Sequence, residues 1–234
     1  MEVIALLLER LGGRFASELG IDVTSGPTAR QQWFLAAILY GARISGGLAA
    51  RTFRVFAARG VVHPEAVLKQ GWDGLVALLD EGGYARYDYK TATKLLQGMQ
   101  SLKDQYEGDL ERLHAAARDY LDLETRLKNL APGIGPATAN IFLRELRGVW
   151  SKAAPPLSPL AQLAGEHAGL IPAGLTPEAA LVALAGEWQR QKAPGRDFAD
   201  LEAALVRLGR DYCRKLKGPP CPLENFCPRS QASP

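Results

Sequence analysis

The chain has 234 residues, of which 47% are hydrophobic and 23% are charged, so it can bury a sizeable core as an ordinary globular protein does. Its apolar run at residues 3–8 is short and flanked by charged residues, which excludes a membrane span there and favours an amphipathic helix over a signal peptide. We therefore expect a cytoplasmic protein without a membrane partner, and the net charge of +3 permits an anionic partner without requiring one.

Apolar residues recur with a helical period from one end of the chain to the other, and no stretch alternates polar and apolar residues over the length of a strand. The sequence therefore predicts an all-α fold. We expect helices at about residues 2–19, 28–40, 46–59, 64–69, 72–80, 88–107, 109–117, 121–130, 136–147, 157–167, 176–191 and 197–213. The segment at residues 151–159 cannot be helical through its prolines.

A glycine turn at residues 132–135 joins the expected helices at 121–130 and 136–147. Glycine lets the backbone adopt conformations closed to other residues and approach a ligand closely, and the start of the next helix presents unpaired N–H groups. Such a turn can hold a phosphate oxygen, whereas the alternative is an ordinary helical hairpin whose glycines only make the turn. The candidate phosphate-binding residues are Gly133, Ile134, Gly135, Ala137 and Thr138.

All three cysteines lie near the C-terminal end of the chain, as Cys213, Cys221 and Cys227. Thiolates this close along a Pro-rich loop can converge on one metal centre. A disulfide is the alternative, but it suits a cytosolic chain poorly. The basic residues nearby, including Lys215 and Lys217, form either a DNA-facing patch or a solvated helix face.

The pattern Leu-x-x-Leu-x-Pro-Gly-Ile-Gly-x-x-Thr-Ala at residues 127–139 resembles the helix-hairpin-helix of the endonuclease III superfamily of DNA glycosylases. The order of an N-terminal helix, the hairpin and a Cys-rich tail along most of the chain is similar too. The resemblance implies a helical barrel-like lobe at residues 22–130, and a second lobe at residues 1–21 and 131–234 where the N-terminal helix packs with the C-terminal helices and the Cys loop (213–227). Duplex DNA with a damaged or mismatched base would lie between the lobes of a monomer.

The resemblance also implies a 4Fe-4S iron-sulfur cluster in the Cys loop, whose family pattern is Cys-x6-Cys-x2-Cys-x5-Cys. Cys213 matches the first ligand, and Cys221 and Cys227 match the last two, but the second ligand has no counterpart near residues 218–220. Three outcomes stay open: a 4Fe-4S cluster with a non-cysteine fourth ligand, a three-iron or labile cluster, and a loop without metal.

The resemblance puts the family's catalytic residues at positions where this chain has none. Many members carry, at the position of Ala137, a lysine that attacks the sugar C1′ atom, and a methyl group cannot do so. Members also carry an aspartate further along; relatives with a similar Leu-Arg-Glu-Leu-Arg-Gly-x-Trp stretch have it at the position of Ala154. If the loop differs in length by a few residues, Ser158 is the only polar candidate after the prolines. Two explanations of the alanine stay open, a natural divergence and an engineered change.

Residues 81–92 form the other stretch rich enough to hold a site, with Tyr84, Arg86, Asp88 and Lys90 behind a Gly-Gly turn. These side chains offer stacking faces and polar contacts for an extruded base, and Asp88 and Lys90 are also candidate catalytic groups. The alternative is a plain helix N-terminus, with Asp88 placed to favour the helix dipole and the tyrosines packed half-buried.

Arg43 lies in the turn after the apolar helix expected at 28–40. In relatives this turn inserts a glutamine wedge into the duplex where the base is flipped, and Arg43 takes that position. An arginine can fill the gap, stack on bases and contact a phosphate, unless it only caps the helix in solvent.

These features together predict a monofunctional DNA glycosylase, which flips a base and hydrolyses its N-glycosidic bond by attack of water. An active enzyme would have to work without the usual carboxylate. The alternative is a catalytically inactive module that recognises damaged or distorted DNA, and this alternative accounts for the missing lysine and aspartate without a further assumption.

Overall fold

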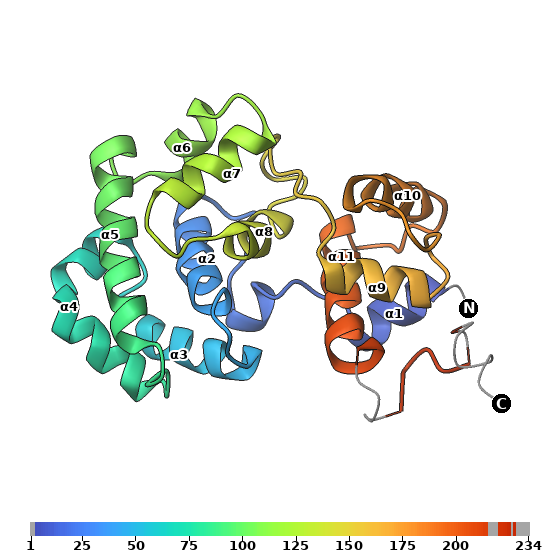
Figure 1. The fold of residues 1–234 in the computed structure, drawn as a ribbon, viewed down its shortest axis with the longest axis horizontal. Helices are drawn as coiled ribbons and strands as arrows, with labels where there is room; N and C mark the ends of the chain where they lie inside the picture. The colour runs from blue at the N-terminus through green and yellow to red at the C-terminus, as the bar shows by residue number, and fades with distance from the viewer. Residues whose placement is uncertain (1–2, 215–219, 226, 228–234) are drawn as a thin grey trace. The chain divides into compact units, whose positions relative to one another are not determined.

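The fold was analysed in a computed structural model, which describes residues 3–214, 220–225 and 227. These residues form eleven α-helices, one 3₁₀ turn and one π-helical turn, and none of them lies in a strand (Figure 1). The predicted all-α class is therefore confirmed for this part of the chain. Within the same residues, none of the helices combines the length and the apolar character that crossing a bilayer requires.

Contacts divide the chain into two compact units. The larger unit is Ala16–Ala154, and the smaller unit comprises residues 1–15 and 155–234. The larger unit contains η1 (Ser17–Leu19), α2 (Pro27–Tyr40), α3 (Gly46–Ala58), α4 (Pro64–Glu81), α5 (Asp88–Tyr106), α6 (Leu110–Ala116), α7 (Tyr120–Asn129) and α8 (Pro136–Arg144). The smaller unit contains α1 (Val3–Leu11), α9 (Pro159–His167), α10 (Pro177–Arg190), α11 (Phe198–Leu208) and η2 (Gly209–Cys213).

Helix α2 is the central element of the larger unit, where it contacts α3, α5, α6 and α8 (Figure 1). Residues 33–39 are all buried, as expected of a helix that is apolar around its whole circumference. The Trp33 Nε1–H group donates a 3.1 Å hydrogen bond to the carbonyl oxygen of Phe142 on α8. The rings of Phe34 and Phe142 also meet edge to face at 5.1 Å, so the core of this unit holds α8 in place.

The observed units differ from the expected lobes in where the hairpin belongs. The sequence placed residues 131–154 in the lobe of the C-terminal helices, whereas the contacts group them with residues 16–130. Residues 131–154 belong to the larger unit because α8 packs on α2. Local sequence patterns do not show this contact between distant helices.

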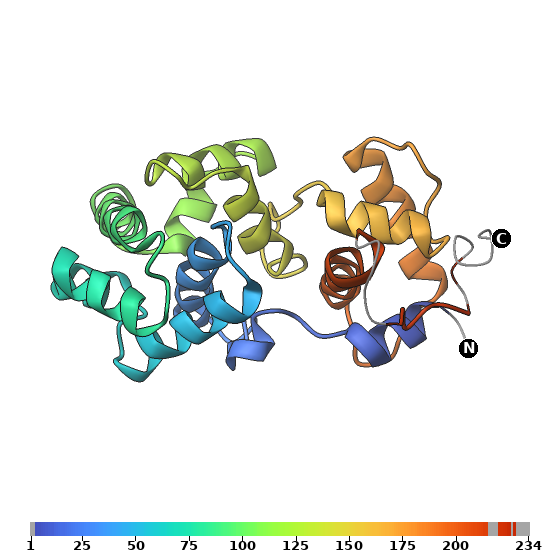
Figure 2. The same ribbon diagram turned by 60° about the horizontal axis from the view of Figure 1, so that its bottom comes forward.

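Helix α11 is the core of the smaller unit, with residues 201–208 all buried. It contacts both α1 and α9, so the predicted packing of the N-terminal helix on the C-terminal helices is present (Figure 2). The Arg207 guanidinium lies 4.0 Å from the centroid of the Phe15 ring and donates to the carbonyl oxygens of Leu11 and Gly13. Arg207 therefore joins α11 to the N-terminal segment.

The expected helix at residues 2–19 is interrupted. Helix α1 ends at Leu11, and Gly13 follows with a φ of 96°, in the left-handed region that favours glycine. The chain forms only a short 3₁₀ turn again at Ser17–Leu19. By contrast, the expected pair at 64–69 and 72–80 is present as the two arms of α4, which bends at Gly71.

Candidate nucleic-acid interface

The predicted helix, glycine turn and helix are present as α7, residues 130–135 and α8. Gly133 has a φ of 88°, which reverses the chain in a conformation that side chains disfavour. The Ile134 side chain is buried, and its N–H group donates to the Ala131 carbonyl oxygen at 3.1 Å. Ile134 therefore anchors the turn, and its N–H group is already used inside the protein.

The start of α8 leaves backbone donors available. The N–H groups of Gly135, Ala137 and Thr138 have no acceptor within the part of the chain that the structure describes, and Pro136 has no N–H group. Gly135 is the N-cap, with an ordinary φ of −102° and no side chain to cap the helix. A Cβ atom there would meet nothing within 4 Å, so neither the backbone nor the neighbours demand glycine at this position.

Thr138 has a packing role in the same turn. Its side chain is buried, and a Cβ atom at Gly41 would overlap its Oγ1 atom. The close approach brings the turn after α2 against the first turn of α8. Only the backbone N–H group of Thr138 is thus a candidate for ligand binding, whereas the hydroxyl group lies in the contact with Gly41.

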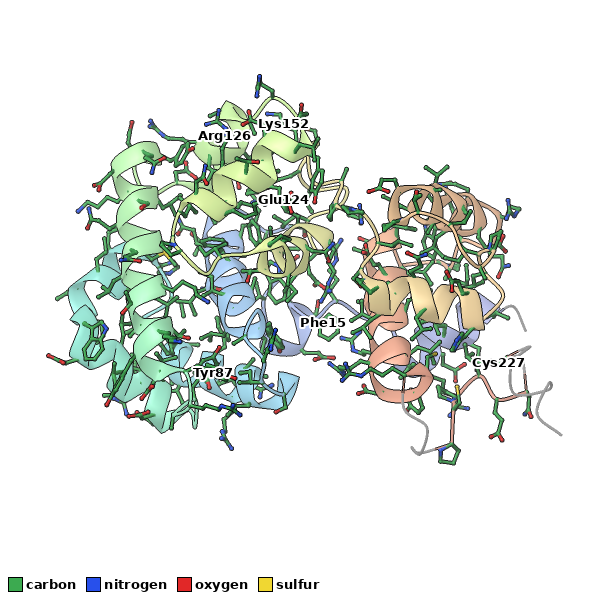
Figure 3. All side chains as sticks on the ribbon, in the orientation of Figure 1. Phe15, Tyr87, Glu124, Arg126, Lys152 and Cys227 are labelled. Atoms are coloured by element: carbon green, nitrogen blue, oxygen red, sulfur yellow. The ribbon has the colours of Figure 1, made fainter. Side chains whose placement is uncertain are left out.

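A cavity of about 590 Å³ lies in the larger unit beside the hairpin. It is lined by three segments: residues 41–43, residues between 87 and 97 around the start of α5, and residues 132–133. The lining residues of the second segment are Tyr87, Tyr89, Lys90, Thr91, Thr93, Lys94 and Gln97. Figure 3 labels Tyr87 at this end of α5. The volume falls within the range of about 300–1,000 Å³ that small-ligand pockets have. The tertiary structure therefore brings together three of the segments that the sequence singled out separately.

The cavity wall is positively charged. Among its lining residues are Arg43, Lys90 and Lys94, and the lining contains no Asp or Glu. Arg43 and Lys90 are exposed, as a contact with a phosphate backbone requires. Lys94 is half-buried, and this burial lowers the pKa of its ammonium group.

Tyr84 occupies a different place from the one expected. Its ring is only 1% exposed, and its hydroxyl group donates a 2.8 Å hydrogen bond to the Leu39 carbonyl oxygen at the end of α2. Burial raises the pKa of Tyr84 to about 12, so the phenol stays protonated at neutral pH. The expectation that Tyr84 contacts a base is therefore corrected: in this structure the ring fixes the turn after α2 from inside.

Replacing Tyr84 by phenylalanine is expected to lower the free energy of unfolding by about 1 kcal/mol, because the buried hydrogen bond from its hydroxyl group to the Leu39 carbonyl oxygen is lost. DNA affinity should stay unchanged, since the ring does not reach the surface. Urea denaturation and titration with a labelled duplex measure the two effects. A clear loss of affinity in a folded Tyr84→Phe protein would show that the hydroxyl group has a role beyond packing.

Asp88 and Arg86 lie near the cavity but outside its lining. The Asp88 Oδ1 atom accepts the Tyr89 N–H group at 2.8 Å, which fits the helix N-terminus interpretation. Desolvation, together with the charge of Asp88 and a hydrogen bond to it, raises the pKa of Asp80. The Arg86 guanidinium lies 5.4 Å from the centroid of the Tyr87 ring. Asp88 is thus already engaged with its neighbours, and no contact supports a role as a general base.

Ala154, where the resemblance expects a carboxylate, and Ser158, the polar candidate after it, are also outside the cavity lining. Ala154 is exposed at the end of the larger unit. Ser158 belongs to the smaller unit and caps α9, where its Oγ atom accepts the Ala161 N–H group at 3.3 Å. The Ser158 hydroxyl group therefore has a structural task, as a serine at a helix N-cap commonly does.

The described cysteines do not present a preformed metal site. No group of three or more His, Cys, Asp or Glu residues converges in residues 3–214, 220–225 and 227. The Cys227 thiol donates to the His167 carbonyl oxygen at 3.1 Å (Figure 3). Burial raises the pKa of the Cys221 thiol. The iron-sulfur cluster, with Cys213 as a further ligand, stays a prediction from the resemblance.

Lys215 and Lys217, the expected basic contacts to DNA, lie outside the described residues.

The sequence did not predict two other residues near the cavity as parts of the site. Trp72 is 40% exposed; its ring lies 5.3 Å from that of Tyr89, and its Nε1–H group donates to Thr93 Oγ1. Lys94 was missed too, although its spacing of four from Lys90 predicts the same helix face.

Comparison with protein families and with curated proteins found no match to this chain. The functional assignment therefore depends on the hairpin, on the cavity beside it and on the resemblance of residues 127–139. Of these, the cavity is the observation that the sequence did not contain.

Proposed function

We propose that this protein binds duplex DNA through the hairpin and holds an extruded nucleotide in the cavity beside it. We base the proposal on one observation: the cavity joins the Arg43 turn, the start of α5 and the glycine turn, for which the sequence had separately predicted the wedge, the base pocket and the phosphate contact. A nucleotide presents a phosphate and a base in one ligand, and these segments offer a partner for each.

The phosphate contact follows from the start of α8. Unpaired N–H groups at a helix N-terminus, together with the positive end of the helix dipole, favour an anion. The open space at Gly135 allows a phosphate oxygen to approach the backbone closely. Lys94 supplies a positive charge on the other side, because a Cβ atom on Gly133 would lie 3.4 Å from the Lys94 Nζ atom.

The base contact follows from the aromatic side chains at the cavity. Tyr87 and Tyr89 line it, and Tyr89 is 60% exposed beside the ring of Trp72. Exposed aromatic faces stack on bases of any sequence, which suits a base that has left the duplex. Arg43 at the rim is the candidate to fill the gap that the base leaves in the stack.

The proposed reaction is hydrolysis of the N-glycosidic bond of the damaged or mismatched base by water, with release of the base and formation of an abasic site. The second candidate function is a recognition module without this activity. The cavity lining favours the second candidate on one point, because it contains no carboxylate to activate water or stabilise a cationic sugar.

A panel of end-labelled duplexes with uracil, oxidised, deaminated or alkylated bases tests both candidates. The protein and its Ala154→Asp variant are incubated with each duplex, and alkali then reveals abasic sites as strand breaks. Breaks made by the protein itself would support the glycosylase. Breaks only with Ala154→Asp would mean that the protein is a disabled form of the enzyme. Binding without breaks by either version would support the recognition module. Equal affinity for damaged, intact and competitor DNA, without breaks, would overturn the proposal.

A further inference from the structure

A second hollow adjoins the cavity and has no part in the proposed function. It has a volume of about 540 Å³ and lies between α4 and α5, which pack side by side in the larger unit (Figure 1). Its lining residues are Leu68, Gly71, Leu96, Gln97, Gln100 and Ser101. Gln97 also lines the cavity, so the two spaces meet at this side chain. We call the second space the α4–α5 groove.

The lining of the α4–α5 groove suits a nucleobase better than a phosphate. Leu68 and Leu96 are half-buried and offer an apolar wall, and among the described residues no charged side chain belongs to the lining. Gln97 and Gln100 are exposed, and their amide groups can hydrogen-bond the edge of a base. The Gln100 Nε2 atom donates to Asp104 Oδ1 at 2.7 Å, which leaves the Gln100 carbonyl oxygen as an acceptor.

Trp72 lies where the groove meets the cavity. It follows Gly71, which lines the groove, and its Nε1–H group donates at 3.0 Å to the Oγ1 atom of Thr93, which lines the cavity. This hydrogen bond and the Tyr89 ring at 5.3 Å hold the indole in place, yet Trp72 is 40% exposed. An exposed indole in a fixed orientation is a stacking platform for an unpaired base.

Positive charge lies on the same face of α5. Lys90, Lys94 and Gln97 all line the cavity, and they are spaced so that they share one face of the helix within two turns. Two neighbouring nucleotides are joined by one phosphate, which these lysines can contact. A strand with one base in the cavity and the next in the groove would therefore keep its phosphate beside the lysines and its second base beside the uncharged lining.

We propose that the α4–α5 groove binds a second unpaired base, next to the nucleotide held in the cavity, with Trp72 stacked on that base. The preferred substrate class is then DNA with two consecutive unpaired nucleotides, in place of a single base extruded from an otherwise paired duplex. The inference rests on the proposed function, because the occupant of the groove is the neighbour of the extruded nucleotide.

Matched duplexes test the inference. One probe carries a bubble of two unpaired nucleotides, and in two further probes a tetrahydrofuran replaces either nucleotide of the bubble, so that one base is missing while the opening is the same. We expect the two-base bubble to bind about tenfold more tightly than either one-base bubble, because stacking of one base supplies a difference of this size. Fluorescence anisotropy of labelled probes measures the affinities.

Intrinsic fluorescence locates the second base. The other three tryptophans, Trp33, Trp150 and Trp188, are at most 6% exposed, so Trp72 is the one that a base can reach. We expect the two-base bubble to quench the emission of Trp72 and to shield it from acrylamide, whereas one-base bubbles should do neither. Equal quenching by one-base bubbles would mean that Trp72 stacks on the base in the cavity, and this result would overturn the inference.

Variants make the test specific. Trp72→Ala should bring the ratio of two-base to one-base affinity close to one, and Trp72→Phe should keep part of it, because a phenyl ring still stacks. Gln105→Ala is the matched control: Gln105 is exposed on α5 but outside both linings, so the ratio should not change. Circular dichroism spectra of all variants should coincide, which excludes unfolding as the cause of a loss.

An intact duplex in the same titration separates the two proposals. If one-base bubbles bind more tightly than intact DNA but the second base adds neither affinity nor quenching, the inference fails and the proposed function stands. If no bubble binds better than intact DNA, both fail. An undiminished ratio in folded Trp72→Ala would place the second base away from the groove and would also overturn the inference.

Discussion

A Gly135→Asp protein is expected to bind duplex DNA at least about tenfold more weakly than the unchanged protein while being no less stable. The ordinary φ of −102° and the empty space around Gly135 mean that the side chain fits without strain. Aspartate is moreover a favoured N-cap residue, so the free energy of unfolding should rise by a few tenths of a kcal/mol, about the usual difference from glycine. The carboxylate would occupy the donors of Ala137 and Thr138 and repel a phosphate.

The prediction is specific because DNA affinity should fall while the free energy of unfolding should rise. Electrophoretic mobility shift measures the affinity, and urea denaturation measures the free energy of unfolding. Gly135→Ser caps the helix without adding charge, so its loss of affinity should be smaller. Thr125→Asp places the same charge on an exposed position of α7 away from the cavity lining and should bind nearly normally. Equal affinities for Gly135→Asp and the unchanged protein would exclude the start of α8 as a phosphate site.

Gly209→Ala is expected to lower the free energy of unfolding of the smaller unit by about 2–3 kcal/mol, at the upper end of the usual cost of overpacking. A Cβ atom at Gly209 would overlap the carbonyl oxygen of Leu160 on α9, and its carbonyl carbon would be 2.8 Å away. Backbone atoms inside a packed helix pair cannot swing aside as a flexible side chain can. Helices α9 and α11 would have to separate, although alanine is itself the better helix former.

Gly186→Ala is the matched control, because Gly186 lies inside α10 and a Cβ atom there would meet only Arg190 Nη1, at 3.8 Å. This variant should be more stable by about 0.5–1 kcal/mol. Hydrogen exchange of the amides in α9 and α11 should accelerate in Gly209→Ala alone. Unchanged exchange in that variant would mean that the two helices tolerate a wider spacing.

The sequence by itself determined the helices, because helical periodicity and end signals depend on residues within a few turns of one another. The expected helices at 28–40 and 46–59 agree with α2 and α3 to within a residue at each end. The hairpin was predictable for the same reason, since its glycines, its proline and its flanking helices are neighbours in the chain. The interrupted helix at residues 2–19 shows the limit, because a Gly-Gly pair can lie in a helix or end one.

Only the tertiary structure decided which residues meet. Tyr84 and Lys90 are close in the sequence, yet the first is buried under α2 and the second lines the cavity. Trp72 is exposed and Lys94 is half-buried against the hairpin, the reverse of what side-chain type alone suggests. Helices distant in sequence pack together, and this packing determines burial and the contacts between α5, the Arg43 turn and the glycine turn. A local sequence pattern does not indicate which helices pack together.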